Sequence, residues 1–417
     1  MKHLFYRIIF LLVCFISFSP LYGQSKSPID IEFTGMFWFT TTYNFQSSDP
    51  NWAEMLRPTR LLDDQGRPFA DNGSFGISVR PSRVGFNTRQ STAKGDLVTR
   101  FELDLVGGGS NVGETFFRVF NAYAEWNRWT FGKRNSVFMD GSVVPNTVEF
   151  FGPSGMVLLR NIQVSYKLVD SQKSQIQVGL ENPSASSDLG PFRQDFTFRE
   201  KLSDIVFTNK LPALTFHYRR NFKYGHLQAG WVTKYISWFD KGRTPQADFS
   251  GEAWGYGTNI SGSINPSSNI RLLGSFVIGK GIQNFLNDGT ADVGVQANPT
   301  NTITPVNGAA IPFYSLMAAS EITLTETLSS TIAFSRVVND TFESQLSTSF
   351  QSGSYLTVGL MHRPIPGISF GLEYQYADRQ NANFAGAPEF TLPAAQGNFF
   401  AINKIQANFI YRFSKSN

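Results

Sequence analysis

The stretch ISFGLEYQY, residues Ile368 to Tyr376, carries an apolar or aromatic side chain at every second position and polar residues such as Glu373 and Gln375 between them. Successive side chains of a β-strand point to opposite sides, so a period of two predicts a strand with one apolar and one polar face. The same alternation recurs at residues 97–105, 227–235 and 401–413. No segment sustains the periodicity of an amphipathic helix.

The breaks between these segments alternate in length. Short breaks lie at residues 93–96, 127–128, 170–174, 224–225, 266–268, 326–327 and 366–367, and long ones at 44–72, 140–155, 183–209, 240–251, 281–310 and 381–397. Short turns at one end and long loops at the other are typical of outer-membrane barrels. We therefore expect an all-β, transmembrane antiparallel β-barrel of about sixteen strands. Its last strand should pair with the first, residues 31–45, so that no edge is left unpaired in lipid.

Composition and the N-terminus agree with an exported membrane protein. Residues 1–23 have the positive start, short apolar run and small residue of a secretory signal peptide, so residues 24–417 should form the barrel. Cleavage would remove Lys2, Arg7 and the only cysteine, Cys14, and would lower the formal net charge from +4 to about +2. So small an excess argues against nucleic acid as a partner.

Aromatic residues make up 15% of the chain while its mean hydropathy is only −0.17, and no later window is long and apolar enough for a transmembrane helix. A secreted β-sandwich or β-helix is the soluble alternative.

The stretch SVRPSRVGFNTR, Ser78 to Arg89, holds three arginines and a proline inside an alternating segment. The parity of the apolar positions changes between Arg80 and Arg83, and Pro81 lies at the change. Proline inside a sheet is confined to edges and bulges, and a bulge re-aims the side chains beyond it. We expect Arg80 and Arg83 to point into a water-filled lumen.

Other arginines extend this basic surface. Arg100 and Arg134 face inward by the parity of their strands, Arg118 is ambiguous because its strand has phenylalanine on both faces, and Arg160 shares the parity of outward residues. Arginines on adjacent strands would attract anions, and their planar guanidinium groups suit carboxylates. Ordinary solvated lumen residues are the simpler interpretation.

Residues 138–158 form the third long loop, which is too apolar for a solvated external loop because it contains Val148, Phe150 and Phe151. We expect it to fold into the barrel and to bring Asp140 and Glu149 near the arginines. Opposite charges across a narrow pore create a transverse field. The alternative is an outer loop packed on its neighbours or on another subunit.

Other motifs are weak. The triple glycine at 107–109 lies between strands, where no helix N-terminus could hold phosphate. The histidines lack metal-ligand spacing, and no Ser-His-Asp order is recognisable, although geometry and not order defines such a triad. The sequence therefore predicts no cofactor, no metal and no enzyme.

Five motifs between Ser82 and Arg160 together resemble the DcaP-like outer-membrane porins: SRVGF at 82–86, ELDLVGGG at 102–109, AYAE at 122–125, Gly132 leading to FMD at 138–140, and FFGPSG at 150–155. The resemblance implies a sixteen-stranded, trimeric barrel of the Gram-negative outer membrane that admits small, often negatively charged solutes such as dicarboxylates. The chain lacks the helical segment that precedes the barrel in some members.

The sequence thus predicts a porin for passive diffusion of small hydrophilic, anionic solutes, with a pore lined by Arg80, Arg83, Arg100, Arg134, Asp140 and Glu149. Expected partners are outer-membrane lipid and lipopolysaccharide, two further copies of the chain, and the solutes. The alternative is a surface anchor or receptor whose lumen is blocked.

Overall fold

The computed structural model describes residues 29–63, 67–108, 111–183, 205–244, 248–298, 300–301, 306–342, 345, 348–382 and 399–416. The predicted signal peptide lies outside these residues, as do most of the loops predicted at 183–209 and 381–397. Within the described part, no helix is long and apolar enough to cross a bilayer.

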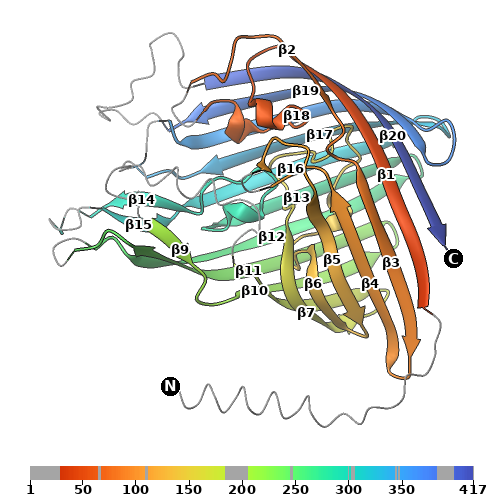
Figure 1. The fold of residues 1–417 in the computed structure, drawn as a ribbon, viewed down its shortest axis with the longest axis horizontal. Coiled ribbons are helices and arrows are strands. Elements are labelled where there is room, and N and C mark those ends of the chain that lie inside the picture. Colours follow the sequence, from red (N-terminus) through yellow and green to blue (C-terminus); the bar gives the residue numbers. More distant parts are fainter. Residues whose placement is uncertain are drawn as a thin grey trace.

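The regular secondary structure of the described residues consists of strands and four short 3-10 helices (Figure 1). The strands are β1 (Ile29–Asn44), β2 (Ser74–Ser78), β3 (Arg83–Thr92), β4 (Gly95–Asp104), β5 (Arg118–Trp126), β6 (Trp129–Asn135), β7 (Arg160–Asp170), β8 (Ser174–Glu181), β9 (Ile205–Thr208), β10 (Ala213–Phe222), β11 (Gly225–Asp240), β12 (Gly251–Ser267), β13 (Ile270–Lys280), β14 (Val293–Ala297), β15 (Val306–Ala310), β16 (Pro312–Thr323), β17 (Leu328–Asn339), β18 (Phe350–His362), β19 (Ile368–Asn381) and β20 (Phe399–Ser416). The 3-10 helices are η1 (Pro50–Trp52), η2 (Pro58–Arg60), η4 (Gly141–Val143) and η5 (Gln283–Phe285).

The sheet is a closed antiparallel barrel of sixteen strands, which confirms the predicted fold class. β1 pairs with β20 over Glu32 to Asn44 and with β3 on its other side, so the last strand meets the first. β2 and β9 add no positions around the ring, because β2 continues β3 along β1 and β9 continues β10 along β11. β14 and β15 form a separate hairpin.

The strand β19 shows why the sequence forms this barrel. Outward Phe370 and Leu372 are 47% and 55% exposed, whereas their inward neighbours Glu373 and Gln375 are 1% and 0% exposed. Apolar side chains therefore cover the outside and polar side chains line the inside, which is the pattern of transmembrane barrels. The same pattern holds on β11, where Leu227 and Trp231 are exposed and Gln228 and Lys234 are buried.

The predicted difference between the two barrel ends is present. The seven short turns join β3 to β4, β5 to β6, β7 to β8, β10 to β11, β12 to β13, β16 to β17 and β18 to β19, and the C-terminus lies at their end of the barrel (Figure 1). Asn127 takes a positive φ of 54° in the β5–β6 turn, and Gly367 one of 84° in the β18–β19 turn. Asparagine and glycine are the residues that tolerate this conformation in tight turns.

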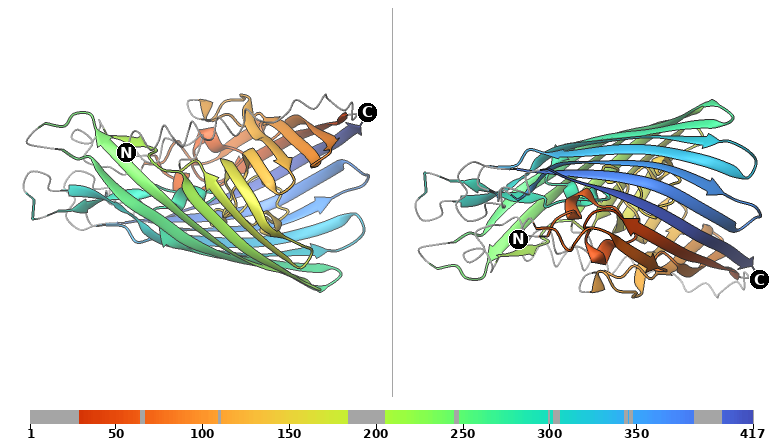
Figure 2. Two further views of the ribbon diagram at one scale, coloured as in Figure 1. Left: turned by 90° about the horizontal axis from the view of Figure 1, so that it is seen from below. Right: turned by 90° about the horizontal axis from the view of Figure 1, so that it is seen from above.

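Parts of three long connections lie inside the barrel and fill some of it: loop 1 (residues 45–63 and 67–73), loop 3 (136–159) and loop 6 (281–298, 300–301 and 306–311). Phe138, Met139 and Val157 of loop 3 pack with Phe285 and Leu286 of loop 6 in a buried apolar cluster. Inward side chains of β11, β13, β16, β17 and β18 complete it. The apolar character of residues 138–158 is therefore satisfied by a core inside the barrel. In both views of Figure 2 the teal β14–β15 hairpin of loop 6 projects beyond the strands at the end opposite the C-terminus.

Candidate solute-binding site in the barrel lumen

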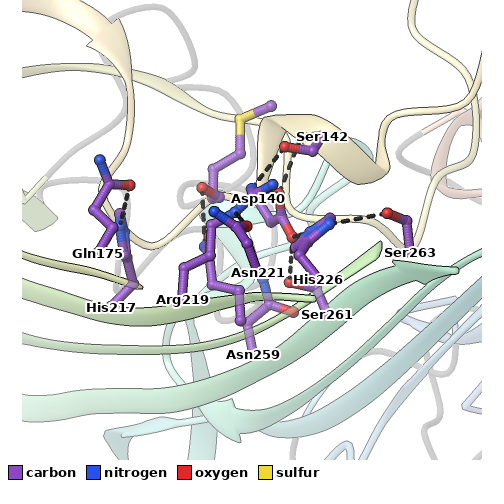
Figure 3. Close-up of polar contacts among 12 residues, drawn as sticks. Asp140, Ser142, Gln175, His217, Arg219, Asn221, His226, Asn259, Ser261 and Ser263 are labelled. Atoms are coloured by element: carbon purple, nitrogen blue, oxygen red, sulfur yellow. Dashed lines mark hydrogen bonds and ion pairs between the residues drawn. The ribbon is translucent and has the colours of Figure 1, made fainter. Parts of the chain in front are cut away.

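Loop 3 begins with an acidic anchor on the inner wall (Figure 3). Asp140 caps η4 by accepting a hydrogen bond from the Ser142 amide at 3.0 Å. Its carboxylate also contacts Arg219 of β10 at 3.3 Å and His226 of β11 at 2.7 Å. Burial alone would raise the pKa of Asp140, but the hydrogen bond from His226, the nearby Arg219 and the Ser142 amide hold it below its ordinary value. Asp140 is therefore an ionised anchor for the loop.

The same anchor contains a contact that the sequence order did not reveal. Nδ1 of His226 lies 2.9 Å from the Ser263 hydroxyl, so Asp140, His226 and Ser263 form a hydrogen-bonded series (Figure 3). Ser261 also donates to Asp140 at 3.0 Å. With four partners the carboxylate holds loop 3, and the imidazole beside it is only 6% exposed.

The middle of loop 3 is held by the opposite part of the wall. Glu373 of β19 accepts hydrogen bonds from the amides of Val148 and Glu149, at 2.7 and 3.3 Å. Glu149 accepts one from the Tyr355 hydroxyl at 2.9 Å and one from the Leu56 amide of loop 1 at 3.2 Å. Burial raises the pKa of Glu149 to about 8, although Lys404 nearby opposes the shift. Glu149 is therefore largely neutral at pH 7.

The positions of these two acids differ from the expectation that they oppose the arginines across the pore. Asp140 pairs with Arg219 and His226, and neither was among the predicted residues. Glu149 lines a cavity together with Arg118 but accepts its hydrogen bonds from Tyr355 and Leu56, and burial favours its neutral form. The hydrogen bonds and ion pairs of both acids therefore hold loop 3 against its neighbours in the barrel.

Three of the four predicted arginines lie on the inner side of the barrel but have carboxylate partners. Arg80 binds Glu54 of loop 1, and Arg134 binds Glu125 of β5. Arg100 binds Glu102, two residues along the same strand, at 2.8 Å. An arginine paired in this way contributes little net charge to the lumen.

Arg83 is different, because aromatic rings surround it. Its guanidinium carbon lies 3.2 Å from the ring centre of Phe120 and 5.6 Å from that of Phe150 in loop 3. Its Nε has no hydrogen-bond partner among the described residues, and none of their carboxylates forms an ion pair with it. The inward direction of Arg83 follows from the interruption at Pro81. Met36 faces Arg83 and Thr40 faces Ser78, so the segment from Ser78 to Arg83 contains one residue more than the facing part of β1.

The structure adds three cations that sequence reasoning left out or could not place. Arg118 binds Asp104 at 2.6 Å, and the guanidinium of Arg160 lies 3.7 Å from the ring centre of Phe120. Lys133 joins Arg118 and Arg160 around a cavity of about 110 Å³ that Phe120 and Phe151 also line. The position of Phe120 follows from a bulge in β5. Glu102 faces Asn121 but Leu103 faces Val119, so Phe120 has no partner on β4. No proline or glycine marks this bulge in the sequence.

A second cavity, of about 140 Å³, lies where loops 1, 3 and 6 meet. Asp288 of loop 6 binds Arg57 of loop 1 at 2.8 Å and the Thr59 amide at 2.9 Å, which joins these loops. The two cavities share Arg118, Phe151, Leu158 and Leu159. Arg118 therefore borders both cavities, and Lys133 and Arg160 line the smaller one beside it.

Comparisons with known proteins agree with this architecture. Residues 23–190 match the sequence model of the DcaP outer membrane protein family, which includes all five motifs on which the resemblance rests. No curated protein matches the chain.

Solved structures share the fold over nearly the whole chain. The outer membrane channel DcaP of Acinetobacter baumannii is 16% identical, with a TM-score of 0.73 over 94% of this chain and 99% of that one. An anion-selective porin from Comamonas acidovorans is 10% identical, with a TM-score of 0.55 over 93% and 100%. The trimer form of OmpT from Vibrio cholerae is 11% identical, with a TM-score of 0.52 over 92% and 99%. At such identities the likeness shows the fold alone. The match over residues 23–190 and the sixteen-stranded barrel show an outer-membrane β-barrel protein that is similar to the DcaP outer membrane proteins.

Proposed function

We propose that the chain is a passive channel for small anionic solutes of the carboxylate type, and that its anion preference comes from the cations around Phe120. The carrying observation is Arg83, which points inward from β3 with an aromatic partner in place of a carboxylate. Lys133 and Arg160 likewise form no ion pair in the described part of the chain. Arg80, Arg100 and Arg134 shape the wall with their charges compensated. The fold shared with an anion-selective porin supports the proposal.

The associated proposals are a homotrimer, a signal peptide at residues 1–23, and outer-membrane lipid and lipopolysaccharide around the apolar outer surface. The trimeric form of OmpT supports the first of these. The exposed aromatic and aliphatic side chains of the outer face support the last. No enzymatic role is proposed, because the His226 imidazole is used as a buried loop anchor.

Single-channel recording in a planar bilayer with a tenfold KCl gradient tests the channel proposal. We expect stepwise conductance and a reversal potential on the anion side. Arg83→Ala should lower the chloride-to-potassium permeability ratio by about sevenfold, because one unit charge about 7 Å away in water favours an anion and disfavours a cation by about 0.6 kcal/mol each. Arg89→Ala is the matched control, because Arg89 is solvent-exposed, pairs with Asp96 and is screened by salt. Cation preference in the wild type would contradict the anion assignment.

One observation favours the alternative of a surface anchor or receptor with a blocked lumen. Loops 1, 3 and 6 pack inside the barrel and bury an apolar cluster there. Silence in the same recording, from a barrel whose folding is confirmed by circular dichroism, would support this alternative over the channel.

A further inference from the structure

We propose that Phe120 determines the selectivity of the channel by holding Arg83 and Arg160 on its ring without cancelling their charge. The inference rests on the proposed function, because it names the residue that keeps the cations available to an anionic solute. It makes Phe120 a positioning residue, which acts through the two arginines.

The ring occupies a place that the sheet leaves open. Phe120 is the extra residue of the β5 bulge and has no partner on β4. The pairing of β5 with β6 begins only at Ala122, opposite Lys133, so Phe120 lies outside that ladder too. The side chain is nevertheless only 6% exposed. A ring in such a gap can be approached by side chains from both neighbouring parts of the wall.

Two guanidinium groups use this ring. The guanidinium carbon of Arg83, from β3, is 3.2 Å from the ring centre, and that of Arg160, from β7, is 3.7 Å away. Both distances are well inside the range of about 6 Å for an energetically significant cation–π contact. The Nε atoms of both arginines are buried and have no hydrogen-bond partner among the described residues.

The nearby carboxylates are already engaged. Glu102 is bound by Arg100 and by Asn121. Asp104 accepts hydrogen bonds from Nε and Nη2 of Arg118, at 3.0 and 2.6 Å, and from the Val106 amide at 3.3 Å. These two acids are the ones that act on Arg83 and Arg160 electrostatically, yet neither forms an ion pair with them. The aromatic ring is therefore the partner that remains.

The choice of partner matters for a permeating ion. A carboxylate cancels a guanidinium charge at every distance beyond the pair, whereas a phenyl ring attracts the cation through its quadrupole, which has no net charge. An anion a few ångströms away consequently experiences almost the full positive charge of Arg83. Without the ring, Arg83 would gain most by turning toward Glu102 or Asp104, and the wall would approach neutrality.

Fluorination of the Phe120 ring separates this role from packing. Mono-, di- and trifluorinated phenylalanine can be incorporated at position 120, because fluorine withdraws charge from the ring face while nearly preserving its shape. We expect the chloride-to-potassium permeability ratio to fall stepwise with each fluorine. The total fall should be about two- to fivefold, the size of a single cation–π contact. Phe120→Leu should lose at least as much, and Phe120→Trp should retain the wild-type ratio.

The control is the same fluorinated series at Phe86, which faces outward on β3 and packs against Phe101. An unchanged ratio along the Phe120 series, with a lower ratio in Arg83→Ala, would overturn the inference and leave the anion channel intact. Equal changes at both positions would also overturn it. A wild type without anion preference would overturn the inference and the proposed function together. Circular dichroism of each variant confirms that the barrel is folded.

Discussion

At the scale of the residue, Glu149 makes stability depend on pH. Its pKa in the folded protein is about 8, above the ordinary value of 4.5. The folded state thus holds a proton that the unfolded state releases, and stability falls as pH rises from about 4.5 to about 8. We expect the thermal unfolding midpoint in detergent micelles to fall between pH 5 and pH 9, and Glu149→Gln to remove part of that fall. Glu326→Gln, in an exposed turn, is the control. A parallel pH profile for wild type and Glu149→Gln would contradict the assignment.

The same scale shows what a sequence can reveal about individual side chains. The inward direction of Arg80 and Arg83 could be predicted because Pro81 marks the change of parity. Arg118 could not be placed, because the β5 bulge at Phe120 has no such marker. The partner of Arg80 could not be found either, since Glu54 lies in a loop with no alternation to orient it. The alternation of a strand predicts whether a side chain points inward or outward, but it does not predict which residue that side chain contacts.

At the scale of the element, loop 3 depends on its first anchor. Asp140→Ala would remove the cap of η4 and leave Arg219 and His226 without their carboxylate. Loss of one partner of a buried, hydrogen-bonded charge costs about 1–3 kcal/mol. We expect faster hydrogen–deuterium exchange of the amides at 138–143, measured by mass spectrometry. The barrel strands should exchange as in wild type.

Ser261→Ala is the milder comparison, because it removes one neutral hydrogen bond to the same carboxylate. It should raise the exchange of these amides less than Asp140→Ala does. Unaltered protection in Asp140→Ala would show that the apolar packing of Phe138 and Met139 holds the loop alone.

The elements themselves were largely predictable, since alternation and short turns leave little freedom. The seven short turns lie where the sequence placed them. Loop 6 was not predicted to enter the barrel, because its polar composition resembles that of a solvated loop. It enters through a few buried contacts, such as Asp292 with Lys234 of β11 and Phe285 with Phe138 of loop 3. Contacts between loops depend on the assembled barrel and have no local signature.

At the scale of the whole molecule, the barrel depends on the seam between β1 and β20. Phe409 of β20 lies on the outer surface of this seam between Phe37 and Phe370, with ring centres 6.3 and 5.3 Å away. We expect Phe409→Lys to lower the free energy of unfolding by about 2 kcal/mol or more, because it places a charge in lipid and removes two aromatic contacts. Urea titration of the barrel in lipid vesicles measures this change.

Ser414→Lys is the control, since Ser414 lies near the end of the same strand and is exposed. Its lysine should reach water and leave the unfolding free energy nearly unchanged. Equal losses in the two variants would show that the position of the charge relative to the seam is unimportant.

The path of loop 3 also has a mechanical consequence. The loop is fastened to β10 and β11 at Asp140, to β17 at Ser154 and Gly155, and to β19 and β20 at Val148. A hollow barrel one sheet thick deforms under lateral pressure more easily than a barrel whose opposite walls are joined from inside. Loop 3 joins strands that lie far apart around the barrel, so it resists a change of the barrel's cross-section from round to oval. The bore should therefore keep its dimensions when the surrounding bilayer is stretched or compressed.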